Sequence, residues 1–188
     1  MAERMVKHKV FFIWDWEAEE IWLNRMAKQG WNLIKVGFCR YEFEKGEPGQ
    51  WQYRLQAMEK HASTEESQKY LEFVESMDIE VVDTFLYWAY FRQKTAKGPF
   101  EIFSDQESRI RHMKRIMGVI YAILPILLIN LFNMTHLMSI YDGSSPVLFV
   151  LCVLLIAFMA IFTPIAAYGL WRMHKKLKVM QAEKSIQP

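Results

Sequence analysis

Two long apolar runs in the second half of the chain constrain its fold more than any other feature. The first covers residues 116 to about 140 and the second covers 147–171. Each exceeds the roughly 20 residues that a helix needs to cross a hydrocarbon core about 30 Å thick. Within both runs and the turn between them, Asp142 is the only formally charged residue. The sequence therefore predicts two transmembrane helices.

Basic residues flank the two runs and predict the orientation of the protein. They are Arg109, Arg111, Lys114 and Arg115 before the first run, and Arg172, Lys175, Lys176 and Lys178 after the second. The short turn at 141–146 carries no basic residue. Since positively charged flanks stay in the cytoplasm, we expect a two-span protein of the cell membrane with both termini cytoplasmic.

Three polar residues recur at every third position of the first run: Asn130, Asn133 and His136. This spacing places them on one side of a helix. An ion or proton path is one interpretation, and interhelical hydrogen bonding is the other. We favour interhelical contacts, because two helices enclose no pore and the runs contain no acidic partner.

The charge of the segment before the apolar runs argues against nucleic-acid binding. Residues 1–108 contain 14 Lys and Arg against 19 Asp and Glu, a net charge of −5. Phosphate contacts require clustered basic residues, which this part of the chain lacks. The two cysteines, Cys39 and Cys152, lie in different environments, and no spacing suggests a disulfide or a metal site.

The first hundred residues predict six elements in the order β-α-β-β-α-β. Strands are expected at 9–16, 33–44, 51–57 and 79–92. One helix is expected between Asp15 and Gly30, and a second from the capping pair Ser63 and Glu66 to Met77.

This order is typical of the split βαβ, or ferredoxin-like, α+β fold. Right-handed crossovers would then place both helices on one face of a four-stranded antiparallel sheet. Trp51, Tyr53 and Leu55 alternate along one strand and should face the helices. The opposite side would present Gln52, Arg54 and Gln56, a candidate interaction face for a partner protein, a second copy of the chain or an apolar small molecule.

Four regions follow from these patterns. Residues 1–100 form a cytoplasmic ferredoxin-like domain, 101–115 a juxtamembrane helical linker, 116–171 the transmembrane hairpin and 172–188 a basic cytoplasmic tail. Ser104 and Glu107 have capping-box spacing, so a helix that starts near Asp105 is expected to continue into the first span.

Residues 8–60 resemble the bacterial domain-of-unknown-function family 2812. The resemblance is carried by an aromatic first strand, the segment from Trp22 to Met26, the Gly30-Trp31 corner with Leu33, the run from Tyr41 to Glu47, and Tyr53-Arg54. Ile102 to Asp105 is also similar. The resemblance implies a C-terminal helical hairpin and a signalling role, since such proteins are often found beside PadR-type transcription regulators. It brings no functional residues.

No enzyme signature is present in the sequence. The five histidines are scattered, no phosphate-binding glycine loop occurs, and no catalytic, cofactor or metal residues can be assigned. We expect a non-enzymatic, membrane-anchored regulatory or sensing module that binds a protein such as a PadR-type regulator. Two alternatives are an accessory subunit of a membrane transporter and a binder of an apolar small molecule.

Overall fold

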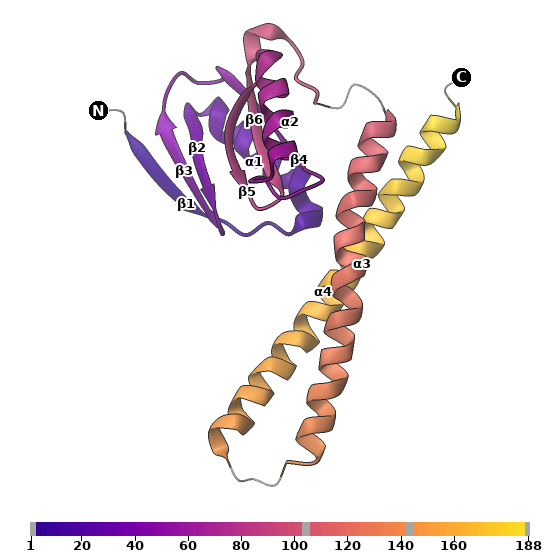
Figure 1. The fold of residues 1–188 in the computed structure, drawn as a ribbon. Helices are drawn as coiled ribbons and strands as arrows, with labels where there is room; N and C mark the ends of the chain where they lie inside the picture. The colour runs from indigo at the N-terminus through magenta and orange to yellow at the C-terminus, as the bar shows by residue number, and fades with distance from the viewer. Residues whose placement is uncertain (1–2, 103–105, 142–144, 187–188) are drawn as a thin grey trace. The chain divides into compact units, whose positions relative to one another are not determined.

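The computed structural model describes residues 3–102, 106–141 and 145–186 of the chain. The chain divides into two compact units, Met1–His112 and Met113–Pro188. The first unit is an α+β structure, and the second consists of long helices (Figure 1).

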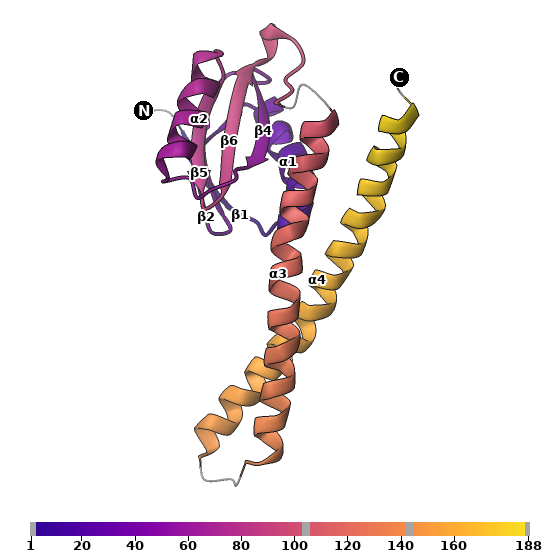
Figure 2. The ribbon, with the colours of Figure 1, turned by 45° about the vertical axis from the view of Figure 1, so that its right-hand side comes forward.

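Six strands and two α-helices make up most of the first unit, whose ribbon is drawn in Figures 1 and 2. In chain order they are β1 (Arg4–His8), α1 (Trp16–Lys28), β2 (Trp31–Gly37), β3 (Arg40–Lys45), β4 (Trp51–Ala57), α2 (Glu65–Ser76), β5 (Glu80–Phe85) and β6 (Trp88–Lys94). Short 3₁₀ turns occupy Ile13–Asp15 and Thr95–Lys97. The strands form two three-stranded antiparallel sheets, with the orders β1-β3-β2 and β4-β6-β5.

The expected four-stranded sheet was wrong, because two of the expected strands are hairpins. The segment 33–44 belongs to β2 and β3, and 79–92 belongs to β5 and β6. Each hairpin has a tight turn, and Cys39 and Leu86 have φ values of 52° and 55° in these turns. Glycine, asparagine and aspartate are the usual residues at such positions, so neither turn had a recognisable signal. The α+β class is confirmed, and the ferredoxin-like arrangement is not.

The two sheets are copies of one β-α-β-β pattern. The first repeat is β1-α1-β2-β3 and the second is β4-α2-β5-β6, with matching strand orders. The register of each hairpin shifts within its first strand, between Leu33 and Lys35 in β2 and between Val81 and Asp83 in β5. The first unit is therefore an internal structural repeat.

Side chains of the second sheet bond to backbone groups of β2. The N–H of Leu33 donates to the hydroxyl of Tyr53 at 2.9 Å, and the N–H of Val36 donates to Asp83 Oδ2 at 2.7 Å. These bonds satisfy groups that the β2 edge would otherwise leave open. They also connect the two repeats.

The first strand begins earlier than the sequence suggested. Strand β1 is Arg4–His8, while most of the expected strand 9–16 is a connection that ends in the 3₁₀ turn. Phe11 of this connection packs on Trp22 and Tyr41, with ring centroids 5.7 and 6.3 Å away. Phe11 therefore packs the connection onto α1, whereas Phe12 and Trp14 stack on each other.

Helices α1 and α2 cover opposite faces of the β4-β6-β5 sheet, which corrects the expectation that both lie on one face. Tyr90 of β6 shares a core with Leu23 of α1, whereas its neighbour Phe91 shares a core with Leu71 and Val74 of α2. Adjacent strand residues point to opposite faces. Tyr53 and Leu55 meet α1, as predicted for their side of β4.

The helix ends agree only in part with the predicted caps. Helix α1 follows Asp15, whose side chain makes no capping hydrogen bond, and its C-terminal turn leads to Gly30 with φ 81°. Thr64, and not Ser63, caps α2 by accepting the N–H of Ser67. The predicted capping residue Ser104 lies outside the described residues.

The second unit contains the expected apolar runs. Helix α3 is Gln106–Ser139, which belongs to this unit from Met113 onward, and α4 is Pro146–Ile186. Both are long and apolar enough to cross a membrane. The hydroxyl of Tyr121 on α3 and Nε2 of His174 on α4 form a hydrogen bond.

Candidate functional site

The three residues of the predicted interaction face on β4 all make polar contacts within the first unit. Gln52 donates to the carbonyl of Gly98 at 3.0 Å, and Gln56 accepts the hydroxyl of Tyr70 on α2 at 2.7 Å. Arg54 forms an ion pair with Glu20 of α1 at 3.1 Å. Strand β4 is an edge strand of a sheet covered on both faces, so each of the three predicted residues has a partner inside the unit.

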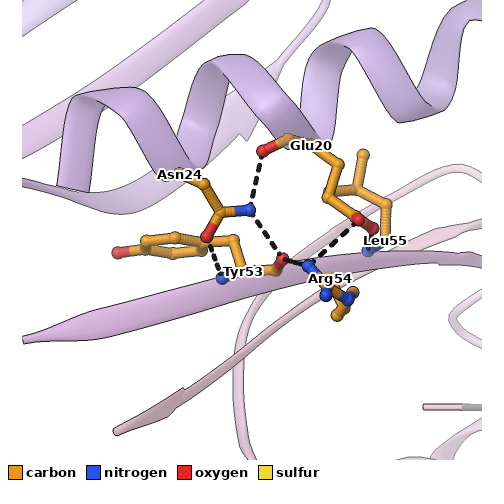
Figure 3. A network of polar contacts seen from close by, with 5 residues as sticks. All are labelled: Glu20, Asn24, Tyr53, Arg54 and Leu55. Carbon is orange, nitrogen blue, oxygen red and sulfur yellow. Dashed lines mark hydrogen bonds and ion pairs between the residues drawn. The ribbon is translucent and has the colours of Figure 1, made fainter. Parts of the chain in front are cut away.

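Helical side chains instead close the outer edge of β4. The amide of Asn24 acts like a neighbouring strand, accepting the N–H of Tyr53 at 2.9 Å and donating to its carbonyl at 3.0 Å. Glu20 Oε2 accepts the N–H of Leu55 at 3.1 Å. Figure 3 shows these contacts between α1 and β4. An open edge invites pairing with another strand, and these side chains prevent it.

His112, near the start of α3, closes the end of the same edge. Its Nε2 accepts the N–H of Ala57 at 2.8 Å, so the ring proton in this contact must be on Nδ1. The ring makes edge contacts with Trp16 and Trp88, with centroids 5.1 and 6.1 Å away. His112 is buried and belongs to the first unit, so the beginning of α3 is part of the α+β fold.

Glu20 carries the main electrostatic feature of this edge. Burial raises the pKa of its carboxyl above the ordinary value, while Arg54 and the N–H of Leu55 act in the opposite direction. The guanidinium of Arg54 also donates to the Tyr53 carbonyl at 3.1 Å and lies 5.9 Å from the ring of Phe100. Backbone groups of β4 thus hold both members of the Arg54–Glu20 ion pair in place.

A groove runs between α1 and β4 beside this pair, and we call it the α1–β4 groove. It consists of two hollows of about 230 and 930 Å³, and both are lined by Glu20, Ile21 and Arg54. Ile21 is 61% exposed. The smaller hollow adds residues from α1, β4, the segment before α3 and α3 itself: Trp16, Glu17, Leu55, Glu101, Ile102 and Arg109. Apolar side chains and side chains of both charges therefore line one surface.

A second ionisable group lies in the core next to this groove. Glu19 Oε1 accepts the hydroxyls of Tyr41 and Tyr90, each at 2.8 Å. Burial raises the pKa of Glu19, and the two tyrosine hydrogen bonds partly offset this effect. Because the two tyrosines come from different sheets, Glu19 connects α1 to both repeats.

The other predicted residues lie along the two long helices. Asn130 donates to the carbonyl of Ile126 in its own helix at 2.8 Å. Asn133 and His136 follow on α3. Of the flanking basic residues, Arg109 lines the α1–β4 groove, Arg111 pairs with Glu107 at 3.3 Å, and Lys175 lies 6.0 Å from the Trp171 ring. The others are on α3, Lys114 and Arg115, and on α4, Arg172, Lys176 and Lys178.

Residues that commonly bind metals are dispersed in the part of the chain that the structure describes. No group of three or more His, Cys, Asp or Glu lies close enough there to hold a metal ion. Cys39 and Cys152 are both free thiols.

Sequence reasoning missed Glu20, Asn24 and His112. Glu20 and Asn24 are four positions apart on α1, which places them on one face of the helix, and this spacing was a usable signal. Nothing in the sequence indicated that the face would meet a strand edge. In the sequence His112 is one of five scattered histidines, and its acceptor role depends on a strand that lies far away along the chain.

Comparison with known families gives one match. A family model described as a protein of unknown function, DUF2812, matches residues 15–125, which confirms the resemblance seen in the sequence. No curated protein and no solved structure matches the chain.

Proposed function

The chain belongs to the DUF2812 family of proteins of unknown function, and we propose that it is a membrane-anchored regulatory module. In this proposal its α+β unit lies on the cytoplasmic side and binds a partner protein in the α1–β4 groove. A PadR-type transcription regulator is the first partner to test, since the family resemblance implies it. The proposal assigns no catalytic step to the chain.

The composition of the groove is the observation that carries the proposal. An exposed Ile21 lies beside the Arg54–Glu20 ion pair, and further charges of both signs surround them. Apolar contact rimmed by polar groups is typical of protein interfaces, whereas pockets for apolar small molecules are more enclosed and less charged. A segment of another protein is therefore the ligand that fits this surface best.

Membrane anchoring is supported by the second unit. Both α3 and α4 are long and apolar enough to form a span, and basic residues flank them as the orientation rule requires. Since α3 contributes His112 to the α+β unit, the first span and the binding unit share one continuous helix. Arg109, which lines the groove, lies on the same helix.

Affinity capture from solubilised membranes tests the proposal. The full chain carries Ile21→Glu in one sample and Phe73→Glu in a control, because both residues are exposed, 61% and 59%, and Phe73 lies on α2 away from the groove. We expect the wild type and the control to retain a partner that Ile21→Glu loses. A DNA-binding regulator as that partner supports the regulatory role, and a permease supports the transporter-subunit alternative.

Two outcomes contradict the groove as the binding surface. One is equal capture by Ile21→Glu and the wild type, and the other is equal loss in both variants. Arg54→Ala is a poorer probe than Ile21→Glu, because it leaves the partly buried carboxylate of Glu20 without its partner.

A further inference from the structure

Three loops at one end of the α+β unit expose large apolar side chains. They are the β1–α1 connection, the β2–β3 turn and the β5–β6 turn, which lie together at the lower end of this unit in Figure 1. Their exposed residues are Val10, Phe38, Leu86 and Tyr87, which we call the turn surface. Phe38 is the most exposed of them, at 84%.

Hydrogen bonds within the unit hold these loops at one end. The N–H of Lys9 donates to the Cys39 carbonyl at 3.1 Å, which joins the connection to the first turn. The Val36–Asp83 bond, just before both turns, joins the two hairpins. The N–H of Met58 donates to the Tyr87 carbonyl at 2.7 Å, which places the end of β4 there as well.

The same end of the unit is the one from which the chain continues along α3. Met58 follows Ala57, whose N–H is bound by His112. The apolar run begins at Ile116, four positions after His112, which is about 6 Å of helix rise. The turn surface therefore lies at the end of the unit that binds His112, and the first apolar run follows His112 in the sequence.

We propose that the turn surface inserts into the interfacial region of the lipid bilayer that holds the protein. The inference rests on the membrane anchoring proposed above. Exposed aromatic and aliphatic side chains on adjacent loops are suited to the headgroup boundary, where apolar side chains leave water. The charged residues near the turn surface are of both signs, so they do not form a basic patch for anionic lipid. The basic ones are Lys9, Arg40 and Lys60, and the acidic ones include Asp15 and Glu59. Arg40 also forms an ion pair with Glu42 at 2.7 Å. Insertion thus depends on apolar contact and needs no anionic lipid.

Environment-sensitive labelling of the full chain tests this docking. In a Cys39→Ser, Cys152→Ser background, a fluorophore is attached at Phe38→Cys, at Leu86→Cys or at the control Phe73→Cys, and each protein is reconstituted into phosphatidylcholine vesicles. We expect blue-shifted emission and quenching by a shallow lipid-borne quencher at positions 38 and 86, and neither effect at 73. Added phosphatidylglycerol or high salt should leave the result unchanged.

Several results would overturn the proposal. Labels at 38 and 86 that behave like the label at 73 place the turn surface in water. A shift that disappears when the protein is diluted into excess lipid assigns the surface to a second copy of the chain. Extraction of the protein from the vesicles by alkaline carbonate overturns the membrane anchoring and the docking together, whereas resistance to extraction without a shift overturns the docking alone.

Discussion

Glu19 places an ionisable carboxyl in the core, where its hydrogen bonds come from Tyr41 and Tyr90. Glu20, the next residue, points to the edge of β4 and pairs with Arg54. Two adjacent carboxylates on α1 thus serve different purposes, because successive residues of a helix point about 100° apart. One connects the two sheets, and the other completes the candidate binding groove.

Glu19→Gln should change the dependence of stability on pH. Burial raises the pKa of Glu19 in the folded protein above the value of 4.5 expected for an exposed carboxyl. Above that pH the unfolded chain ionises first, so the wild type loses stability as the pH rises toward the folded pKa. Glutamine stays neutral and can still accept both tyrosine hydroxyls. We expect the free energy of unfolding of the variant to rise relative to the wild type as the pH increases from 4.5 toward neutrality.

Urea denaturation of the full chain in detergent, followed by tryptophan fluorescence across this pH range, measures the difference. A constant difference between the two proteins would show that Glu19 does not titrate differently on folding.

Asn24→Leu should destabilise the α+β unit. The substitution leaves the N–H and the carbonyl of Tyr53 without their partner, and an unsatisfied buried polar group costs about 1–3 kcal/mol. Asn24→Asp keeps an acceptor for the N–H and should lose less. Urea denaturation ranks the variants, with Arg25→Ala on the exposed side of α1 as a control near wild type. Equal stability of Asn24→Leu and the control would contradict the edge-closing role.

At the scale of elements, the start of α3 is structurally part of the α+β unit. Its His112 completes a row in which helical side chains bind every second N–H of β4, at Tyr53, Leu55 and Ala57. In the first repeat, the equivalent edge strand is β1, and among the described residues no side-chain hydrogen bond closes the outward N–H groups of Arg4, Val6 and His8. The repeats therefore differ in how their outer edges are protected.

His112→Ala should expose the Ala57 amide. The substitution removes the acceptor of its N–H and the ring between Trp16 and Trp88, so we expect faster hydrogen exchange at residue 57 and a stability loss of about 1–3 kcal/mol. Arg111→Ala changes the neighbouring exposed residue and should leave exchange at 57 unchanged. Exchange mass spectrometry of the full chain in detergent measures both, and unchanged protection in His112→Ala would remove α3 from the fold of this edge.

Three glycines of the α+β unit should differ in how well they tolerate alanine. A Cβ on Gly30 would lie 2.7 Å from the carbonyl oxygen of Gly46 and would also require φ 81°. Gly49 has φ 73° but open space around it, and Gly37 has neither constraint. We expect Gly30→Ala to destabilise most and Gly49→Ala by about 1 kcal/mol, with Gly37→Ala near wild type. Thermal unfolding compares the three, and a loss in Gly37→Ala equal to that in Gly30→Ala would contradict the steric argument.

At the scale of the whole molecule, an internally repeated α+β unit precedes two long apolar helices. Repetition explains how a short chain segment builds two sheets around one central helix, since α1 of the first repeat packs against both sheets. The α1–β4 groove exists only because the two repeats meet in this way. Binding at the groove and anchoring by α3 and α4 are then separate properties of one chain.

The proposed membrane topology can be measured directly. Reporters placed before Arg109 and at the C-terminus should both report a cytoplasmic location, and a reporter inserted at Gly143–Ser144 should report an external one. The reason is that the basic residues precede the first apolar run and follow the second, while the turn between the runs has none. Glutamine in place of the four basic residues after the second run should reduce the fraction of chains whose C-terminus stays in the cytoplasm. These residues are Arg172, Lys175, Lys176 and Lys178. A cytoplasmic signal from the insertion at 143–144 would contradict the two-span arrangement.

The sequence alone determined the features that depend on local pattern. The length of the apolar runs predicted the two long helices. Alternation of apolar and polar residues predicted β4, and helical spacing of apolar residues predicted α1 and α2. The family resemblance was recognised mainly from residues 8–60. These signals are local, because the hydrophobicity of a segment and the spacing of its apolar residues do not depend on which other segment it meets.

Only the tertiary structure decided which strands pair and which edges are closed. The turns at Cys39 and Leu86 lack the residues that usually mark a hairpin turn. Two hairpins were therefore each predicted as one strand, and the internal repeat could not be recognised from the sequence. Arg54 was expected on an open sheet face, but β4 is an edge strand, and the carboxylate that pairs with Arg54 comes from Glu20 on the preceding helix α1. Long-range pairing is settled by the free energy of the whole unit, in which burial of both sheets against α1 outweighs local turn preference.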